Sequence, residues 1–248
     1  MGCEERYADY DALAWFFNRY WGGPFIDRAL PLLERLFLSL LPPGARILDL
    51  CCGTGQLVGA LTARGYQVTG LDGSEAMLRF ARANAPAAEF ILADARDFRL
   101  PAPYHGAVST FDSLNHIMSL HELTRVFQNV HAALLPGGPW MFDLNMEAGY
   151  RARWRGTSAR VEADHAIIDR TRYDADAKIG RSETTMFRLE QGAWQRSDLT
   201  LLQRCYTEEE IRSALEKSGF RDVGVFDTKG DLGWAGHVGR TFFRARRS

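Results

Sequence analysis

The chain has 248 residues, of which 46% are apolar and 25% charged, a composition typical of globular proteins and unlike that of disordered chains. At roughly 150 residues per domain, this length predicts one large domain or one domain with an insert. Thirty basic residues against 31 acidic ones leave a net charge of −1, which lacks the basic excess of nucleic-acid-binding domains. The mainly apolar stretches are far shorter than the roughly 20 residues that cross a bilayer. The four cysteines show no zinc-ligand spacing. We therefore expect a cytoplasmic protein with neither a nucleic-acid nor a membrane partner.

The chain begins with an aromatic-rich stretch, residues 1–41, that we expect to be helical, with Pro31 arguing against one straight helix. Short apolar runs then alternate with amphipathic ones. The expected strands are Ile47–Leu50, Val68–Leu71, Phe90–Leu92, Ala107–Phe111 and Trp140–Leu144. The expected helices are Gln56–Arg64, Glu75–Ala85 and a segment from Ser119 to about Leu134. This alternation predicts a parallel sheet covered on both faces.

The pattern changes after the fifth expected strand. Residues of about 158–205 are typical of a three-stranded meander, with turn signals at Asp174–Gly180 and Gln191–Gly192. Thr207 and Glu210 form a capping box for a last helix, and two further strands close the sheet. We expect an α/β fold: a Rossmann-like, doubly wound, mostly parallel seven-stranded sheet with an antiparallel β insert after strand five. The expected units are an N-terminal helical lid (1–41), a core (42–150 and 206–248) and the insert (151–205).

The segment most informative about function is Ile47-Leu48-Asp49-Leu50-Cys51-Cys52-Gly53-Thr54-Gly55. It predicts a strand ending in an acid, then a tight turn whose glycines let a ligand approach the backbone. Asp72 ends the second strand, where an acid suits the hydroxyls of a ribose, and Asp94 follows the third.

Charge distinguishes between two nucleoside cofactors. NAD would bring a pyrophosphate over the turn, where Asp49 would repel it. S-adenosylmethionine carries no phosphate, and its ammonium and sulfonium groups suit a carboxylate there. The sequence also lacks the Tyr-x-x-x-Lys pair of an NAD-dependent oxidoreductase, since Tyr173 and Lys178 are one residue too far apart. S-adenosylmethionine is therefore the favoured cofactor.

At this point the stretch from about Arg46 to Leu144 resembles the class I S-adenosylmethionine-dependent methyltransferases, and in particular their small-molecule branch, which includes amino-sugar N-methyltransferases. The first motif of that family corresponds to Leu48–Gly55, with Cys51 in place of its first glycine. Gly70–Leu78, Ala93–Arg96 and Leu135–Gly138 resemble later motifs.

The resemblance implies a cofactor site that can be carried over residue by residue. Gly53 and Gly55 would line the methionine part, Asp49 and Cys51 belong to the same motif, and Asp72 would hold the ribose. Asp94 would accept a hydrogen bond from the adenine amino group, and the backbone of Ala95 would meet a ring nitrogen. Thr110 and Phe111 would lie by the sulfonium. Met77 would contact the cofactor or pack in the core, and Arg19 would meet the cofactor carboxylate or lie exposed.

The acceptor is expected after the fourth strand, in the segment Phe111–His116. An amine or hydroxyl acceptor sheds a proton, which His116 could take, or His116 could simply pack in a loop. Tyr10 belongs to a Tyr-Asp pair whose tyrosine faces the active site in the small-molecule branch. The aromatic N-terminus would then form a lid that excludes water and attracts a sulfonium. The insert would form a wall of the acceptor pocket or a subunit contact in a homodimer.

We therefore predict a methyltransferase that moves a methyl group from S-adenosylmethionine to a nitrogen or oxygen of a small molecule by in-line displacement, giving S-adenosylhomocysteine. Three alternatives stay open. The first is a non-catalytic protein that binds the same cofactor. The second is an NAD-binding oxidoreductase. The third is a metal-dependent O-methyltransferase in which Asp112, Asp143 and Asn145 would bind Mg²⁺.

Overall fold

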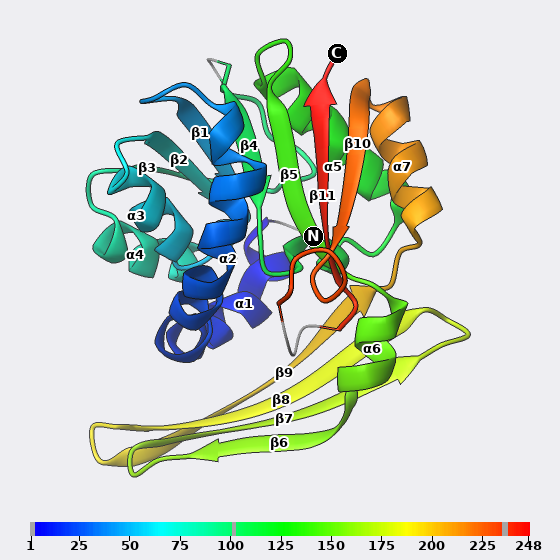
Figure 1. The fold of residues 1–248 in the computed structure, drawn as a ribbon. Coiled ribbons are helices and arrows are strands. Elements are labelled where there is room, and N and C mark those ends of the chain that lie inside the picture. Colours follow the sequence, from blue (N-terminus) through cyan, green and yellow to red (C-terminus); the bar gives the residue numbers. More distant parts are fainter. Residues whose placement is uncertain (1–2, 101–102, 235–237) are drawn as a thin grey trace.

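The computed structural model describes residues 3–100, 103–234 and 238–248, with side chains from Tyr10 onward in the first helix. Two sheets form its framework (Figure 1). The seven strands of the central sheet are, in spatial order, β10 (Phe220–Asp227), β11 (Arg240–Arg247), β5 (Pro139–Asn145), β4 (Gly106–Ser109), β1 (Arg46–Leu50), β2 (Gln67–Asp72) and β3 (Glu89–Leu92).

The central sheet is mostly parallel, as the sequence predicts. Neighbouring strands from β3 to β5 pair parallel, whereas β11 pairs antiparallel with both β5 and β10. Successive residues of β1 point to opposite faces, so Ile47 and Leu48 enter two different apolar clusters. A sheet that buries both faces must be covered by helices on both sides.

Helices on the two faces complete the core. On one face α5 (Leu120–Ala133) and α7 (Glu208–Lys217) pack through residues such as Phe127 and Leu215. On the other face α2 (Gly22–Leu36) and α3 (Gln56–Thr62) bury Leu33, Leu57 and Val58. The remaining core helix, α4 (Glu75–Asn84), begins at Ser74, whose hydroxyl accepts the Met77 N–H, as expected of a cap. The doubly wound prediction is confirmed.

The N-terminal stretch forms two helices, but the break does not lie at Pro31. The first helix, α1 (Cys3–Tyr20), ends before Trp21, and α2 continues through Pro31. Pro24 lies in the first turn of α2, where its missing N–H needs no partner. None of the helices in the described part of the chain is both long enough and apolar enough to cross a membrane.

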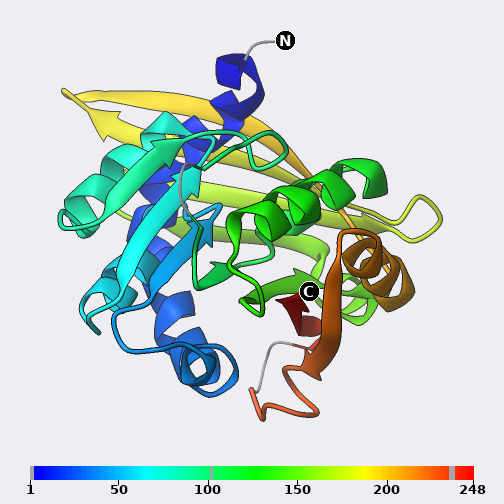
Figure 2. The ribbon, with the colours of Figure 1, turned by 90° about the horizontal axis from the view of Figure 1, so that it is seen from above.

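The insert is a four-stranded antiparallel sheet, not the three strands expected. Its strands are β6 (Arg155–Val161), β7 (His165–Asp174), β8 (Ile179–Glu190) and β9 (Ala193–Arg204), joined in sequence order and preceded by the short helix α6 (Glu147–Arg153). The missed strand is the edge strand β6, whose seven residues are all exposed and show no apolar alternation. In Figures 1 and 2 this second sheet is a separate layer that faces the carboxyl ends of the central parallel strands.

Candidate active site

A cavity of about 580 Å³ lies between the carboxyl ends of the central strands, the N-terminal helices and the second sheet. Its volume falls within the range of small-molecule sites, about 300–1,000 Å³. Ten of the residues predicted from the sequence line it: Tyr10, Asp49, Cys51, Gly53, Asp72, Met77, Ala95, Thr110, Phe111 and His116. The structure therefore brings the expected cofactor and acceptor residues together in one space.

The turn after β1 forms one end of this cavity. Cys51, Gly53 and Gly55 all adopt left-handed backbone conformations, with φ of +59°, +54° and +78°. Cys51 holds this conformation although its Cβ makes it unfavourable. Gly55 does not line the cavity; a Cβ there would lie 2.8 Å from Ala81 on α4. Its role in this structure is to let the turn pack closely against α4.

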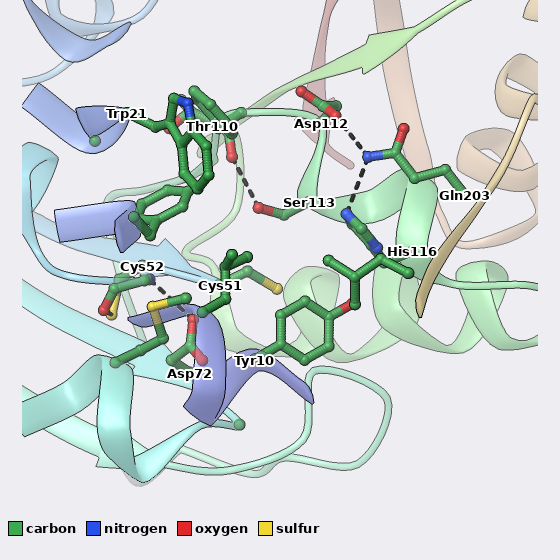
Figure 3. A pocket seen from close by; sticks show the side chains of 18 of the residues that line it. Tyr10, Trp21, Cys51, Cys52, Asp72, Thr110, Asp112, Ser113, His116 and Gln203 are labelled. Carbon is green, nitrogen blue, oxygen red and sulfur yellow. Dashed lines mark hydrogen bonds between the residues drawn. The ribbon is translucent and has the colours of Figure 1, made fainter. Parts of the chain in front are cut away.

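Two carboxylates on this side differ in what they bind. Asp72, labelled in Figure 3, lines the cavity. It accepts hydrogen bonds from the N–H groups of Gly53 and Ser74, each at 2.9 Å, and so holds the two loops together. Asp49 is buried, and among the described residues its Oδ2 has no hydrogen-bond partner. Burial, with a smaller contribution from Asp72, raises the pKa of Asp49 well above its usual value. A buried carboxylate without a partner suits a ligand that carries a positive charge.

Asp94 and Arg19 are not among the lining residues. The carboxylate of Asp94 binds the Arg96 guanidinium at 2.7 and 2.9 Å and accepts the Arg96 N–H at 2.9 Å. Arg96 itself does line the cavity and also contacts Glu122 at 3.2 Å. Arg19 is exposed on α1, where it donates to the Tyr20 hydroxyl at 3.2 Å. Of the two alternatives given for Arg19, the structure has the exposed one.

The segment after β4 is held by a buried ionic cluster. Phe111 and Asp112 have left-handed φ values of +67° and +50°, and their N–H groups donate to Asp143 at 2.7 and 3.1 Å. The guanidinium of Arg240, from β11, binds both Asp143 and Asp112, the latter at 2.5 Å. Asn145 donates to Asp112 at 2.9 Å.

This cluster corrects the metal alternative. Asp112, Asp143 and Asn145 do lie together, as that interpretation required, but the Arg240 guanidinium sits between the two carboxylates and already supplies their positive charge. A divalent cation would have to displace this buried arginine. The acids therefore serve to position Phe111 and Asp112.

Gln203, on β9, connects this cluster to His116 (Figure 3). Its amide nitrogen lies 2.6 Å from Asp112 Oδ2 and 2.9 Å from His116 Nε2. Because an ionised carboxylate can only accept, the Gln203 amide must turn its nitrogen toward Asp112, while its oxygen accepts the Tyr150 hydroxyl at 2.9 Å. The second amide hydrogen then points at His116 Nε2. This assigns the imidazole proton to Nδ1, a buried atom that has no hydrogen-bond partner among the described residues. Burial lowers the pKa of His116 and keeps the ring neutral.

The remaining wall comes from the insert. Alternate residues of β7 and β8 line the cavity, namely Asp169, Thr171, Ser182 and Thr184. The insert thus forms a cavity wall, the first of the two roles expected for it. Sequence reasoning missed these residues and Gln203. On β7, Arg170 and Arg172 alternate with the lining residues Asp169 and Thr171. The alternation of side chains along β7 was the signal in the sequence that could have distinguished the residues facing the cavity from those on the outer face of the sheet.

Comparisons with known proteins agree with this geometry. The family profile described as "Methyltransferase domain" matches residues 47–138. The chain is 30% identical over 213 residues to the putative methyltransferase YqeM of Bacillus subtilis (strain 168), covering 84% of this chain and 86% of that protein. The chain belongs to the class I S-adenosylmethionine-dependent methyltransferases.

Two further similarities extend over most of this methyltransferase. It is 27% identical over 226 residues to the dTDP-4-amino-2,3,4,6-tetradeoxy-D-glucose N,N-dimethyltransferase of Saccharopolyspora spinosa, covering 86% of this chain and 84% of that protein. Its fold is similar to that of CalS10, an amino pentose methyltransferase from Micromonospora echinaspora solved with S-adenosylmethionine bound. The TM-score is 0.72 at 23% identity, with 95% of each chain covered. S-adenosylmethionine is the cofactor of the enzyme.

Proposed function

We propose that this enzyme methylates a nitrogen atom of a small molecule. The observation that supports the proposal is that His116 lines the cavity with its Nε2 2.9 Å from the Gln203 amide nitrogen, an arrangement that assigns the proton of the neutral ring to Nδ1. An amine that gains a methyl group must lose a proton, and a neutral imidazole can receive it. The similarity to an amino-sugar N,N-dimethyltransferase supports nitrogen as the acceptor atom.

The cofactor fits the residues on the opposite side. The unpartnered Asp49 carboxylate suits its cationic groups, the turn at Gly53 allows close approach of the backbone, and Asp72 suits the ribose hydroxyls. S-adenosylmethionine, when bound, supplies a methyl group already activated by its sulfonium. The protein therefore has mainly to align the acceptor, and alignment of this kind is worth an effective molarity of about 10⁵–10⁸ M.

The chain's own residues then perform three tasks. Tyr10 and Phe17 on α1 exclude water, and the Tyr10 ring lies 5.6 Å from that of His116 in an edge-on arrangement. The cluster around Arg240 fixes the segment that carries His116. His116 Nε2 takes the proton of the acceptor nitrogen, replacing the hydrogen bond from Gln203.

Methyl transfer to defined amines tests this proposal. The enzyme would be incubated with S-adenosylmethionine labelled in its methyl group and with matched amino and hydroxy forms of the same small molecules. We expect label on nitrogen in the amino compounds and S-adenosylhomocysteine in equal amount. Label on oxygen in the hydroxy compounds, with none in the amino ones, would refute nitrogen as the acceptor atom.

A further inference from the structure

The cavity wall made by the insert is acidic and rich in hydroxyl groups. Asp169 belongs to this wall, and its Oδ1 accepts hydrogen bonds from Ser182 at 2.5 Å and from Thr184 at 3.0 Å. Thr171 lines the same wall. No described residue donates a hydrogen bond to Asp169 Oδ2, which leaves this oxygen for a ligand.

Two arginines of the same sheet, Arg172 and Arg181, lie side by side on its opposite face and are already paired there. Arg172 and Arg181 both bind Glu183, each at 2.9 Å, and both are largely exposed. Because residues alternate between the two faces of a strand, neither arginine can reach the cavity past Asp169 and Ser182. The face of the second sheet that lines the cavity thus carries the Asp169 carboxylate, whereas Arg172 and Arg181 lie on the outer face.

The charges that line the whole cavity also disfavour an acceptor that carries a phosphate. Four acidic side chains line it, those of Asp49, Asp72, Asp112 and Asp169, and burial raises the pKa of Asp49 and Asp72. Arg96 is the one lysine or arginine among the described lining residues. The charge of Arg96 is taken up by Asp94 and Glu122, and Arg240 neutralises Asp112 from behind. His116 adds no positive charge near neutral pH, because burial lowers its pKa. A phosphate group entering this space would meet Asp169, and the described lining residues offer it no lysine or arginine besides Arg96.

The volume limits the acceptor as well. A cavity of about 580 Å³ is mid-range for a site that holds one drug-sized ligand. Here it must hold the adenosyl cofactor together with the reacting part of the acceptor. The space that remains suits an acceptor group of about monosaccharide size.

We propose that the acceptor is an unphosphorylated, hydroxyl-bearing amine, and that one of its N–H or O–H groups donates to Asp169. This inference rests on the proposed N-methylation and narrows it. In the reaction, the neutral amine nitrogen forms a bond to the methyl carbon as the carbon–sulfur bond breaks, and the displaced proton passes to His116. The acceptor class thus differs from the dTDP-linked sugar in the name of the Saccharopolyspora relative.

A matched pair of acceptors tests the inference: 4-amino-4,6-dideoxy-D-glucose and the same sugar linked to dTDP. We expect kcat/KM for the free amino sugar to exceed that for the dTDP-linked form by about 100-fold, because the two phosphates meet the acidic wall. Preference for the dTDP-linked sugar would overturn the inference and leave N-methylation standing. Absence of product from both sugars would also overturn it, while the amine panel described above decides separately on N-methylation.

Two substitutions test whether the preference for the free amino sugar arises from the cavity wall made by the insert. Asp169→Asn keeps the size of the side chain and one accepting oxygen for Ser182 and Thr184, but removes the charge. We expect KM for the free amino sugar to rise about tenfold, with kcat and the Kd of S-adenosylhomocysteine little changed. Glu183→Gln, on the outer face of the same sheet, is the matched control and should leave all three values unchanged. An Asp169→Asn enzyme with unaltered KM and unaltered preference would contradict the role of Asp169.

Discussion

At the scale of single residues, the protonation state of His116 decides whether the proposed transfer can occur. A base works only while it is neutral, so activity falls as the pH drops through its pKa. Burial lowers the pKa of His116 from the usual value near 6.5, and the nearby Asp112 carboxylate only partly offsets this. We expect kcat to stay constant down to pH 6.5 and to fall only below it. His116→Ala should lower kcat by about 100-fold, in the range of general-base effects, and remove the acidic limb.

The measurement is a pH–rate profile at saturating cofactor and acceptor. His121→Ala, an exposed position on α5, is the matched control and should keep the wild-type profile. A His116→Ala enzyme that turns over within a few-fold of wild type would show that His116 only packs in its loop.

At this same scale, local sequence patterns predict some of the site well and other parts poorly. Asp49, Gly53 and Asp72 follow directly from strands and a turn that neighbouring residues specify. Arg240 could not be assigned in this way. It lies 128 residues from Asp112 along the chain, and only the antiparallel pairing of β11 with β5 brings the two together. Cys51 was visible as a departure from a glycine motif, but its left-handed φ of +59° needed coordinates.

At the scale of elements, α1 packs on α4 through an apolar cluster that includes Leu13, Phe16 and Met77. Polar contacts add to this packing, and we propose that α1 acts as a lid. Asp11 accepts the Ser74 hydroxyl at 2.5 Å and the Ala76 N–H at 3.2 Å, which holds α1 on the first turn of α4. Tyr20 at the end of α1 is hydrogen-bonded to His165 of the insert. Tyr10, Leu13 and Phe17 of α1 line the cavity, and these contacts help to hold them there.

Loss of the Asp11 contacts should therefore loosen the lid. A hydrogen bond to a charged group contributes about 1.5–3 kcal/mol, so Asp11→Ala should weaken S-adenosylhomocysteine binding by roughly tenfold or more through faster dissociation. Stopped-flow dissociation and calorimetric titration measure the rate and the Kd. Asp27→Ala, at an exposed position on α2, is the control. Unchanged dissociation in the Asp11 variant would mean that α1 does not cover the bound cofactor.

The elements themselves were predictable where one face of each is buried. The strands and helices of the core show a clear apolar pattern, because each packs on a sheet. The capping box of α7, from Thr207 to Glu210, is present as expected. The edge strand β6 has no buried face, so nothing in its composition sets it apart from a loop; only pairing with β7 makes it a strand.

At the scale of the whole molecule, buried hydrogen bonds connect the insert to the core. Asn115 donates to the Arg204 carbonyl at 2.8 Å and to the Asn145 carbonyl at 3.1 Å, while Gln203 donates to Asp112. If the second sheet unfolded alone, the core groups in these contacts would lose their partners, and an unsatisfied buried polar group costs free energy. The second sheet should therefore not unfold separately from the core. We therefore expect one cooperative unfolding transition for the entire chain, although the insert is a separate sheet.

Cofactor binding should shift this single transition. A ligand at 100 times its Kd stabilises the native state by about 2.7 kcal/mol, and in a protein of this size each kcal/mol raises Tm by about 2–4 °C. S-adenosylhomocysteine should therefore raise Tm by roughly 5–10 °C in differential scanning calorimetry. NAD at the same concentration should leave Tm unchanged, because Arg96 is the one arginine or lysine among the described lining residues and is already paired with Asp94 and Glu122. Two transitions, of which only one responds to S-adenosylhomocysteine, would show that the insert unfolds independently and that the contacts at Asn115 and Gln203 do not couple it to the cofactor site.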